Sequence, residues 1–184
     1  NNHLLRAKSI HQYDELHGNK VFTFIPFRNP YNQAKSLLNQ HLLLVDLQKK
    51  DEFTLDYMDF LLHHEFGLNH KISIFKNSNL NELKKSDMNN VEYWLEIWYL
   101  FYESVYLEFS KMNNMYFFCY ELFLKNPNYS LKQINGIIGI PEEITNSIEI
   151  KEFTPKASDQ DYTLNQKYLT LYKNLMSISI NNHG

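Results

Sequence analysis

Cysteine is nearly absent from this chain: Cys119 is the only one among 184 residues, which excludes an internal disulfide. It lies in the apolar run Met-Tyr-Phe-Phe-Cys-Tyr, where a buried structural thiol is expected. Glycine and proline are also scarce, at five residues each, whereas aromatic residues make up 15%. Few turn-forming residues and many aromatic ones suit long helices better than a turn-rich all-β fold. We therefore expect a helix-rich α/β fold.

An excess of positive charge and a long apolar run are missing as well. Lys and Arg total 18 against 21 for Asp and Glu, a net charge of −3, so we expect no nucleic-acid partner, which would need a basic face. No uninterrupted apolar stretch approaches the roughly 18 residues of a membrane helix, and the first residues do not resemble a signal peptide. The length suits one compact domain. These observations predict a single domain over residues 1–184, without a membrane span, in the cytoplasm.

Two short apolar segments predict parallel strands. Residues 21–26 (Val-Phe-Thr-Phe-Ile-Pro) and 115–120 (Met-Tyr-Phe-Phe-Cys-Tyr) are almost continuously apolar, as in strands that are covered on both faces of a sheet. After the first segment, Asn29 is a good N-cap and Pro30 a good first helical residue. The sequence therefore predicts a strand, a tight turn and a helix over residues 31–47.

Helical spacing of apolar residues is clearest over Val91–Phe109, where a broad aromatic face is expected to be buried. Ser130 is expected to cap a helix that Gly139 ends. Three further helices are expected, over residues 9–17, 54–64 and 164–176. Residues 67–75 are expected to be irregular or a short strand, and residues 77–90 a loop. The alternation of strands and helices predicts a parallel sheet.

Polar residues follow the first predicted strand. Ligands of open parallel sheets bind beyond the carboxyl ends of the strands. Arg28 stands at the strand exit, and Ser36 lies about two turns into the predicted helix. A helix N-terminus offers unpaired N–H groups and a positive dipole end, arginine adds a planar fork of donors, and serine adds a hydroxyl. This combination suits a phosphate monoester.

The same residues carry a family resemblance. Arg28-Asn29-Pro30 with Ser36 resembles R-[ND]-P-x(5)-S, the 3′-phosphate-binding motif of sulfotransferases that use 3′-phosphoadenosine 5′-phosphosulfate (PAPS). Three further segments agree with the family in the same order: His3-Leu4 with its Lys-x-His-Leu region, Tyr120-Glu121-Leu122 and Asn126-Pro127 with its second strand end, and residues 130–141 with the helix that follows.

The resemblance implies an α/β three-layer, P-loop-like sulfotransferase fold with PAPS as the cofactor and adenosine 3′,5′-bisphosphate as the product. It implies that Arg28 and Ser36 bind the 3′-phosphate and that Tyr120 lies near the adenine. His3 is the candidate general base, which takes the proton from the acceptor. The implied reaction is in-line transfer of a sulfuryl group to a hydroxyl or amine of a small-molecule or carbohydrate acceptor.

The chain departs from the family in two places. It has no Gly-x(4)-Gly-Lys-[Ser/Thr] loop or relaxed form of it to hold the 5′-phosphosulfate, and no C-terminal Arg-Lys-Gly loop. We therefore expect a sheet that is incomplete at its N-terminal edge, and a site that an upstream segment or a partner chain completes. As an isolated chain it is expected to be inactive. The alternative is a catalytically inactive remnant of the same fold that binds a nucleotide or a protein partner.

A second group of polar residues is the run His63-His64-Glu65 with His70. It lacks the His-Glu-x-x-His spacing that places two metal ligands on one helical face, so no metal is expected. His64 and Glu65 are candidates for an acceptor pocket, and the alternative is that they are polar residues that end a helix. The aromatic stripe over residues 93–109 is interpreted as core, although Trp and Tyr can also line an acceptor cleft or a partner surface.

Overall fold

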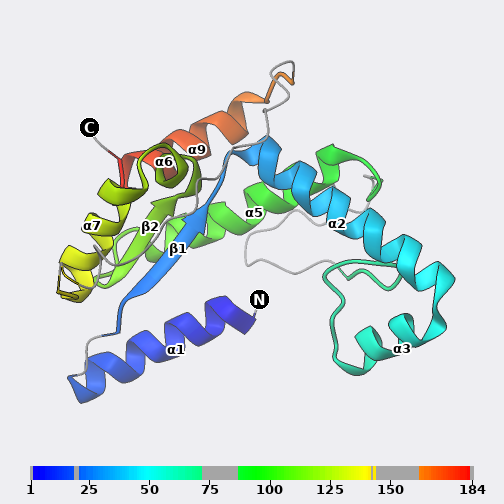
Figure 1. Cartoon of the computed structure of the whole chain (residues 1–184), viewed down its shortest axis with the longest axis horizontal. Coiled ribbons are helices and arrows are strands. Elements are labelled where there is room, and N and C mark those ends of the chain that lie inside the picture. The colour runs from blue at the N-terminus through cyan, green and yellow to red at the C-terminus, as the bar shows by residue number, and fades with distance from the viewer. Residues whose placement is uncertain (1, 19–20, 72–86, 142, 144–161, 183–184) are drawn as a thin grey trace. The chain divides into compact units, whose positions relative to one another are not determined.

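The computed structural model describes residues 2–18, 21–71, 87–141, 143 and 162–182. These residues form mostly helices, together with a small parallel sheet (Figure 1). They divide into two compact units: the first is Pro30–Ser104, and the second combines Asn2–Asn29 with Val105–Gly184. The helix-rich composition with parallel strands agrees with the coarse sequence prediction. The three-layer sulfotransferase fold and the single domain over residues 1–184 stay predictions.

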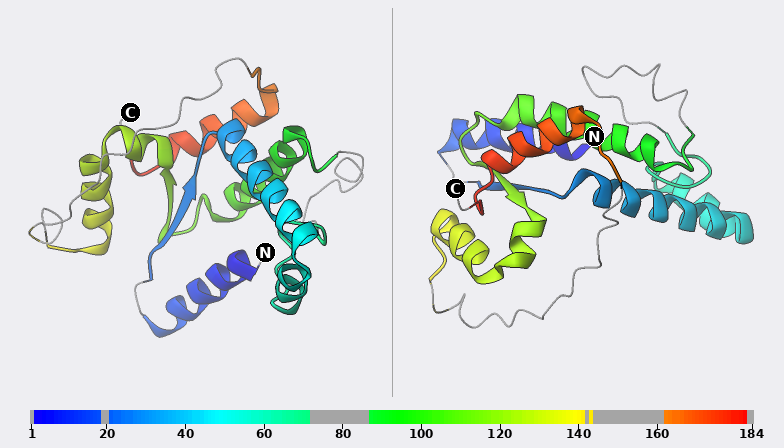
Figure 2. Two further views of the ribbon diagram at one scale, coloured as in Figure 1. Left: turned by 45° about the vertical axis from the view of Figure 1, so that its right-hand side comes forward. Right: turned by 90° about the horizontal axis from the view of Figure 1, so that it is seen from above.

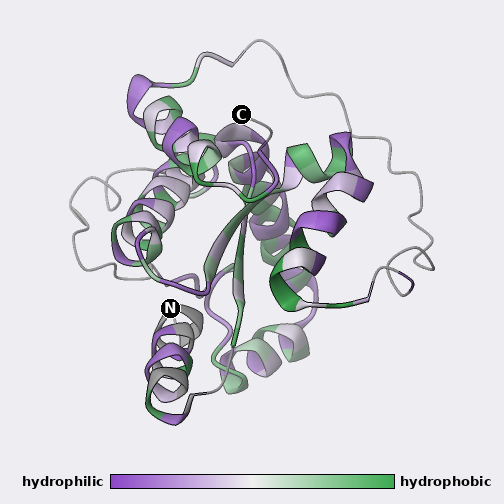
Figure 3. Ribbon diagram, turned by 90° about the vertical axis from the view of Figure 1, so that its left-hand side faces the viewer, coloured by the Kyte–Doolittle hydropathy of each residue, from purple (hydrophilic) through white to green (hydrophobic). Residues whose placement is uncertain are grey.

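The two strands of the second unit are parallel neighbours, as predicted. β1 (Thr23–Phe27) pairs with β2 (Met115–Cys119), and the last residue of β1, Phe27, lies opposite the last residue of β2, Cys119 (Figures 1 and 2). Hydrophobic residues dominate both strands in Figure 3. The side chains of β2 alternate between buried and half-buried, whereas in β1 only Phe27 is fully buried and Pro26 is exposed. β1 is therefore less covered than its apolar run predicts.

Besides the end of α5 (Val91–Phe109), the described residues of the second unit form four helices. They are α1 (Asn2–His17), α6 (Tyr120–Lys125), α7 (Pro127–Ile138) and α9 (Gln166–Ser177). The predicted helices over residues 9–17 and 164–176 correspond to α1 and α9 with shifted ends. The predicted second strand over residues 115–120 is one residue too long, because β2 ends at Cys119 and Tyr120 already begins α6.

The start of α7 differs from the sequence prediction. Its N-cap is Asn126, whose side chain accepts a hydrogen bond from the Tyr129 N–H at 3.2 Å. Asn126 is followed directly by a proline at the first helical position, a pair that starts a helix well. The prediction that Ser130 is the cap is therefore wrong, because Ser130 lies inside the helix and is fully buried. The predicted end at Gly139 is confirmed, with a left-handed φ of 74°.

A buried polar network fixes the C-terminal segment against β2. The segment runs parallel to the strand, with a bridge between Ser179 and Phe117. Asn181 is 1% exposed, and its Oδ1 accepts hydrogen bonds from the Cys119 N–H at 3.0 Å and the Ser179 hydroxyl at 2.6 Å. Its Nδ2 donates to the Cys119 carbonyl at 2.8 Å and to Ser130 Oγ at 3.2 Å. Both lone pairs and both hydrogens of this amide are therefore used.

The first unit is built from α2 (Pro30–Lys50), α3 (Glu52–Phe60) and most of α5 (Val91–Phe109), which continues past the unit boundary. α5 has the bounds that its periodicity predicts. Its aromatic stripe is largely core, because the following side chains are at most 4% exposed: Tyr93, Trp94, Trp98 and Tyr102. α3 ends four residues earlier than predicted, and the prediction for residues 77–90 falls mostly outside the described residues.

The loop after α3 is fastened to α2. Gly67 has a φ of 88°, and a β-carbon there would overlap the carboxamide of Gln48. That buried carboxamide accepts a hydrogen bond from the Leu68 N–H at 2.6 Å. The Gly67 N–H donates to Nδ1 of His41 at 3.2 Å. Glycine is therefore required at this position by its backbone conformation and by the close approach of Gln48, and the loop that carries Glu65 and His70 is held in place.

Candidate functional site at the carboxyl end of the strands

The carboxyl end of the sheet brings Arg28 and Tyr120 together. The paired strands end at the same level, so the residues that follow them come to the same edge. The guanidinium carbon of Arg28 lies 4.8 Å from the centre of the Tyr120 ring, within the range of a cation–π interaction. The sequence predicts that both residues contact a nucleotide, and the second unit places them side by side.

Glu121 fixes this pair in place. Its Oε1 accepts a hydrogen bond from the backbone N–H of Asn29 at 2.9 Å and lies 4.0 Å from Nε of Arg28. Nε of Arg28 is buried and has no hydrogen-bond partner among the described residues, while the side chain as a whole is 39% exposed. Glu121 therefore ties the turn after β1 to the first turn of α6. The guanidinium is held at the edge of the sheet with part of its donor capacity unused.

Cys119 and Tyr172 lie beside the same carboxylate. The Cys119 sulfur is 3.6 Å from Oε2 of Glu121 and 3.9 Å from the hydroxyl of Tyr172. Burial raises the pKa of the Cys119 thiol, and burial also raises the pKa of the Tyr172 hydroxyl. Both groups are therefore neutral at pH 7, and Cys119 is not poised as a thiolate nucleophile. Its buried position agrees with the structural role that the sequence predicts.

The other predicted nucleotide-site residues lie elsewhere in the chain. Ser36 is an exposed residue of α2 in the first unit, and its share in phosphate binding stays a prediction. His3 falls in the first turn of α1, and its side chain lies outside the described part of the structure. The sequence motif contains Glu121 but predicts no separate role for it. The signal that could have found its role is its position, an acidic residue in the first helical turn after a strand.

The run from His63 to His70 does not converge on one point. The side chain of Glu65 is 62% exposed and lies 3.6 Å from Nδ1 of His63. His64 instead turns its Nδ1 toward Asp59, at 3.5 Å from Oδ1, without forming a hydrogen bond. Within the described ranges, no three His, Cys, Asp or Glu side chains are arranged to hold a metal ion. Of the two predicted acceptor residues, Glu65 borders a cavity of the first unit and His64 is absent from its lining.

His70 is held as a neutral ring. Its Nδ1 lies 3.2 Å from the His64 carbonyl, which can only accept, so Nδ1 carries the proton. Nε2 then accepts from the Tyr93 hydroxyl at 2.6 Å. Burial lowers the pKa of His70 and raises that of Tyr93 to about 12. Burial, and secondarily the nearby His70, lowers the pKa of His41, whose Nδ1 must be unprotonated to accept from Gly67.

We expect the first unit to lose stability as the pH falls below 6.5, the ordinary pKa of histidine. Because the folded pKa values of His41 and His70 are lowered, the unfolded chain takes up protons first as the pH decreases. The stability that the two neutral histidines contribute is therefore fully present above pH 6.5 and is lost as the pH falls through their folded pKa values. Denaturant unfolding at pH 7.5 and pH 5.0, followed by tryptophan fluorescence, measures this loss. Trp94 is a suitable reporter because the His41 ring and the His70 ring both pack against it.

His41→Asn is the matched variant for this pH dependence. The amide oxygen of asparagine can accept from the Gly67 N–H but cannot titrate, so the loss of stability between the two pH values should become smaller. His63→Asn serves as the control. This variant should keep the full pH dependence, because the His63 side chain is 57% exposed. An unchanged pH dependence in His41→Asn would show that the lowered pKa of His41 does not contribute.

Comparisons with known proteins do not assign a function. No family model, no curated protein and no solved structure matches the chain. None of the helices in the described ranges combines the length and the apolar character that a membrane crossing requires. The predicted location in the cytoplasm stays a prediction. The local geometry around Arg28 is therefore the basis for a functional proposal.

Proposed function

We propose that the carboxyl end of the β1–β2 sheet binds the adenosine 3′-phosphate part of PAPS and that the chain is a sulfotransferase-like protein. The observation that carries this proposal is the position of Arg28. The residue directly follows a parallel strand, its guanidinium lies over Tyr120, and its buried Nε has no hydrogen-bond partner among the described residues. Ligands of parallel sheets bind at this edge, and an arginine fork suits a phosphate.

The neighbouring residues have distinct proposed roles. Arg28 supplies the charge and the donors for the 3′-phosphate. Tyr120 provides an aromatic ring at the same edge and is expected to contact the nucleoside. Glu121 positions the turn through the Asn29 N–H and does not itself contact the phosphate, since two anionic groups repel each other.

Sulfuryl transfer also needs a base and cations around the moving group. His3 is the proposed base, and the acceptor is a hydroxyl or amine of a small molecule or carbohydrate. The sequence has no phosphate loop, so an upstream segment or a partner chain is proposed to supply the cations that stabilise the transferring group. Without them the chain holds the donor and does not turn it over.

Calorimetric titration with adenosine 3′,5′-bisphosphate tests this proposal, with adenosine 5′-monophosphate as the control ligand that lacks the 3′-phosphate. We expect the bisphosphate to bind at least about 100-fold more tightly, which corresponds to about 2.7 kcal/mol and to one or two charge-assisted hydrogen bonds. Equal affinity for the two nucleotides, or no binding by the folded chain, would contradict the 3′-phosphate site.

The second candidate function is nucleotide binding without catalysis, which the missing phosphate loop favours. Incubation with PAPS labelled in its sulfuryl group tests for catalysis. Transfer to a panel of phenols, amines and sugars would establish the enzyme and exclude the binding-only form. Tight binding of the bisphosphate with no transfer is expected of the isolated chain under both functions, so only transfer discriminates between them.

A further inference from the structure

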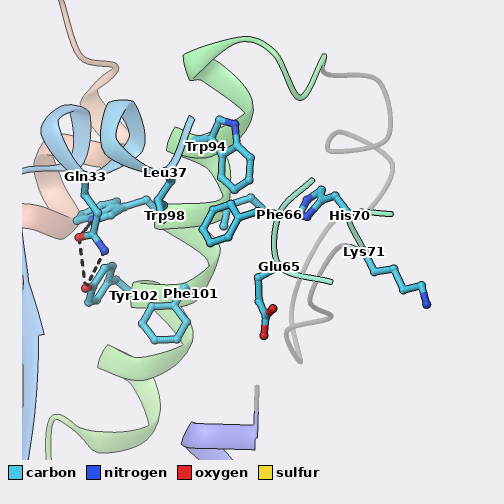
Figure 4. Close-up of a pocket in the computed structure, with 11 residues that line it drawn as sticks. Gln33, Leu37, Glu65, Phe66, His70, Lys71, Trp94, Trp98, Phe101 and Tyr102 are labelled. Carbon is cyan, nitrogen blue, oxygen red and sulfur yellow. Dashed lines mark hydrogen bonds between the residues drawn. The ribbon is translucent and has the colours of Figure 1, made fainter. Parts of the chain in front are cut away.

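A second site lies wholly within the first unit: a cavity of about 240 Å³ beside α5 (Figure 4). Its walls are mainly aromatic, from Phe66, Trp94, Trp98, Phe101 and Tyr102. An engineered apolar cavity of about 150 Å³ is enough to bind benzene. The volume here therefore suits one aromatic ring that carries a short side chain.

The aromatic walls are held in place by contacts with one another. The rings of Phe66 and Trp94 stack with their centres 5.4 Å apart, and those of Trp98 and Tyr102 lie 5.1 Å apart. Nε1 of Trp98 donates to Oε1 of Gln33 at 3.2 Å, which fixes the indole from its polar side. A ligand would therefore enter a cavity whose walls are already ordered, which lowers the entropic cost of binding.

The cavity lining carries one acidic and one basic side chain, Glu65 and Lys71. Glu65 lines the cavity and is accessible to solvent, so its carboxylate is a ready partner for a ligand. Lys71 also borders the cavity, but in Figure 4 its side chain extends away from the aromatic residues. Burial lowers the pKa of His70, so its ring is neutral at pH 7 and adds no positive charge to the cavity. A ligand at this position meets a carboxylate and aromatic rings, and both attract a cation.

We infer that this cavity binds a small aromatic amine. The ring of the ligand packs among Phe66, Trp98 and Phe101, and its ammonium group pairs with the Glu65 carboxylate. The neighbouring aromatic faces add a cation–π attraction. This inference goes beyond the proposed nucleotide site and does not depend on it, since all of the lining residues belong to the first unit.

Titration with 2-phenylethylamine tests this inference, with 2-phenylethanol and phenylacetate as neutral and anionic ligands of similar shape. Both tryptophans of the chain, Trp94 and Trp98, line the cavity, so the change in tryptophan fluorescence reports directly on its occupation. We expect the amine to bind at least tenfold more tightly than the alcohol, and phenylacetate to bind most weakly.

Two variants separate the carboxylate from the general charge of the unit. Glu65→Gln should weaken binding of the amine about tenfold and remove its advantage over the alcohol, and the exposure of this side chain makes a folding defect unexpected. Glu52→Gln removes the same charge from α3, outside the cavity, and should leave the amine affinity unchanged. Equal affinity for amine and alcohol in the natural chain, or no fluorescence response to any of the three ligands, would overturn the inference.

Discussion

Arg28→Ala should lower the affinity for adenosine 3′,5′-bisphosphate at least about 100-fold. A charge-assisted hydrogen bond contributes about 1.5–3 kcal/mol, and an arginine fork can make two of them to one phosphate. The affinity for adenosine 5′-monophosphate should change little, because that ligand lacks the group that Arg28 is proposed to bind. Calorimetry with both nucleotides measures the two affinities. An Arg28→Ala chain that keeps its preference for the bisphosphate would remove the central residue of the proposed site.

Two control variants show whether the fork or the charge matters. Arg28→Lys keeps a positive charge but loses the planar pair of donors, so its affinity should lie between those of the natural chain and Arg28→Ala. Lys125→Ala removes an exposed positive charge from α6 and should change the affinity less than about threefold. The Arg28 variants should remain folded, because the ion pair with Glu121 is partly exposed and such pairs contribute under about 1 kcal/mol.

The elements of the fold that depend on local pattern were predicted well from the sequence. The apolar segments around Ile25 and Phe117 are paired parallel strands, and the period of Val91–Phe109 gives α5 with the same bounds. Ser130 shows where local reasoning fails, because serine is a good cap in isolation. A better start, Asn126 followed by proline, lies just upstream, and the buried amide of Asn181 uses the serine hydroxyl instead.

The candidate site was predictable in part. The motif around Arg28 and the strand end at Tyr120 predict that both residues lie at the carboxyl edge of the sheet, and the structure places their side chains together there. That a ligand binds at this edge stays a prediction. The role of Glu121 depends on a backbone contact with Asn29, 92 residues away in the chain, which no periodicity reveals. The cavity of the first unit could not be predicted from the sequence either, because an aromatic stripe predicts a core but not a gap within that core.

Asn181→Ala should destabilise the second unit by about 3–5 kcal/mol. The substitution leaves the Cys119 carbonyl and the hydroxyls of Ser130 and Ser179 without the partners that Asn181 gives them, and each buried polar group that loses its partner costs about 1–3 kcal/mol. Denaturant unfolding followed by far-ultraviolet circular dichroism measures the loss. Hydrogen exchange of the Cys119 amide should accelerate as well. A loss below about 1 kcal/mol would show that water replaces the amide at little cost.

Asn181→Asp tests the same network with almost no change in shape. An oxygen then replaces Nδ2 and faces the Cys119 carbonyl and Ser130 Oγ, so the buried carboxylate is disfavoured and its pKa should rise above the ordinary value. A raised folded pKa means that the variant is stabilised by protonation, and that this stability is lost as the pH rises through that pKa. The loss of stability of Asn181→Asp relative to the natural chain should therefore be smaller at pH 5 than at pH 7.

The adjacent variant Asn182→Ala is the control and should cost under about 1 kcal/mol at both pH values, because that side chain is only half-buried. A deficit of Asn181→Asp that does not change with pH would mean that the lost donor, and not the buried charge, dominates the cost.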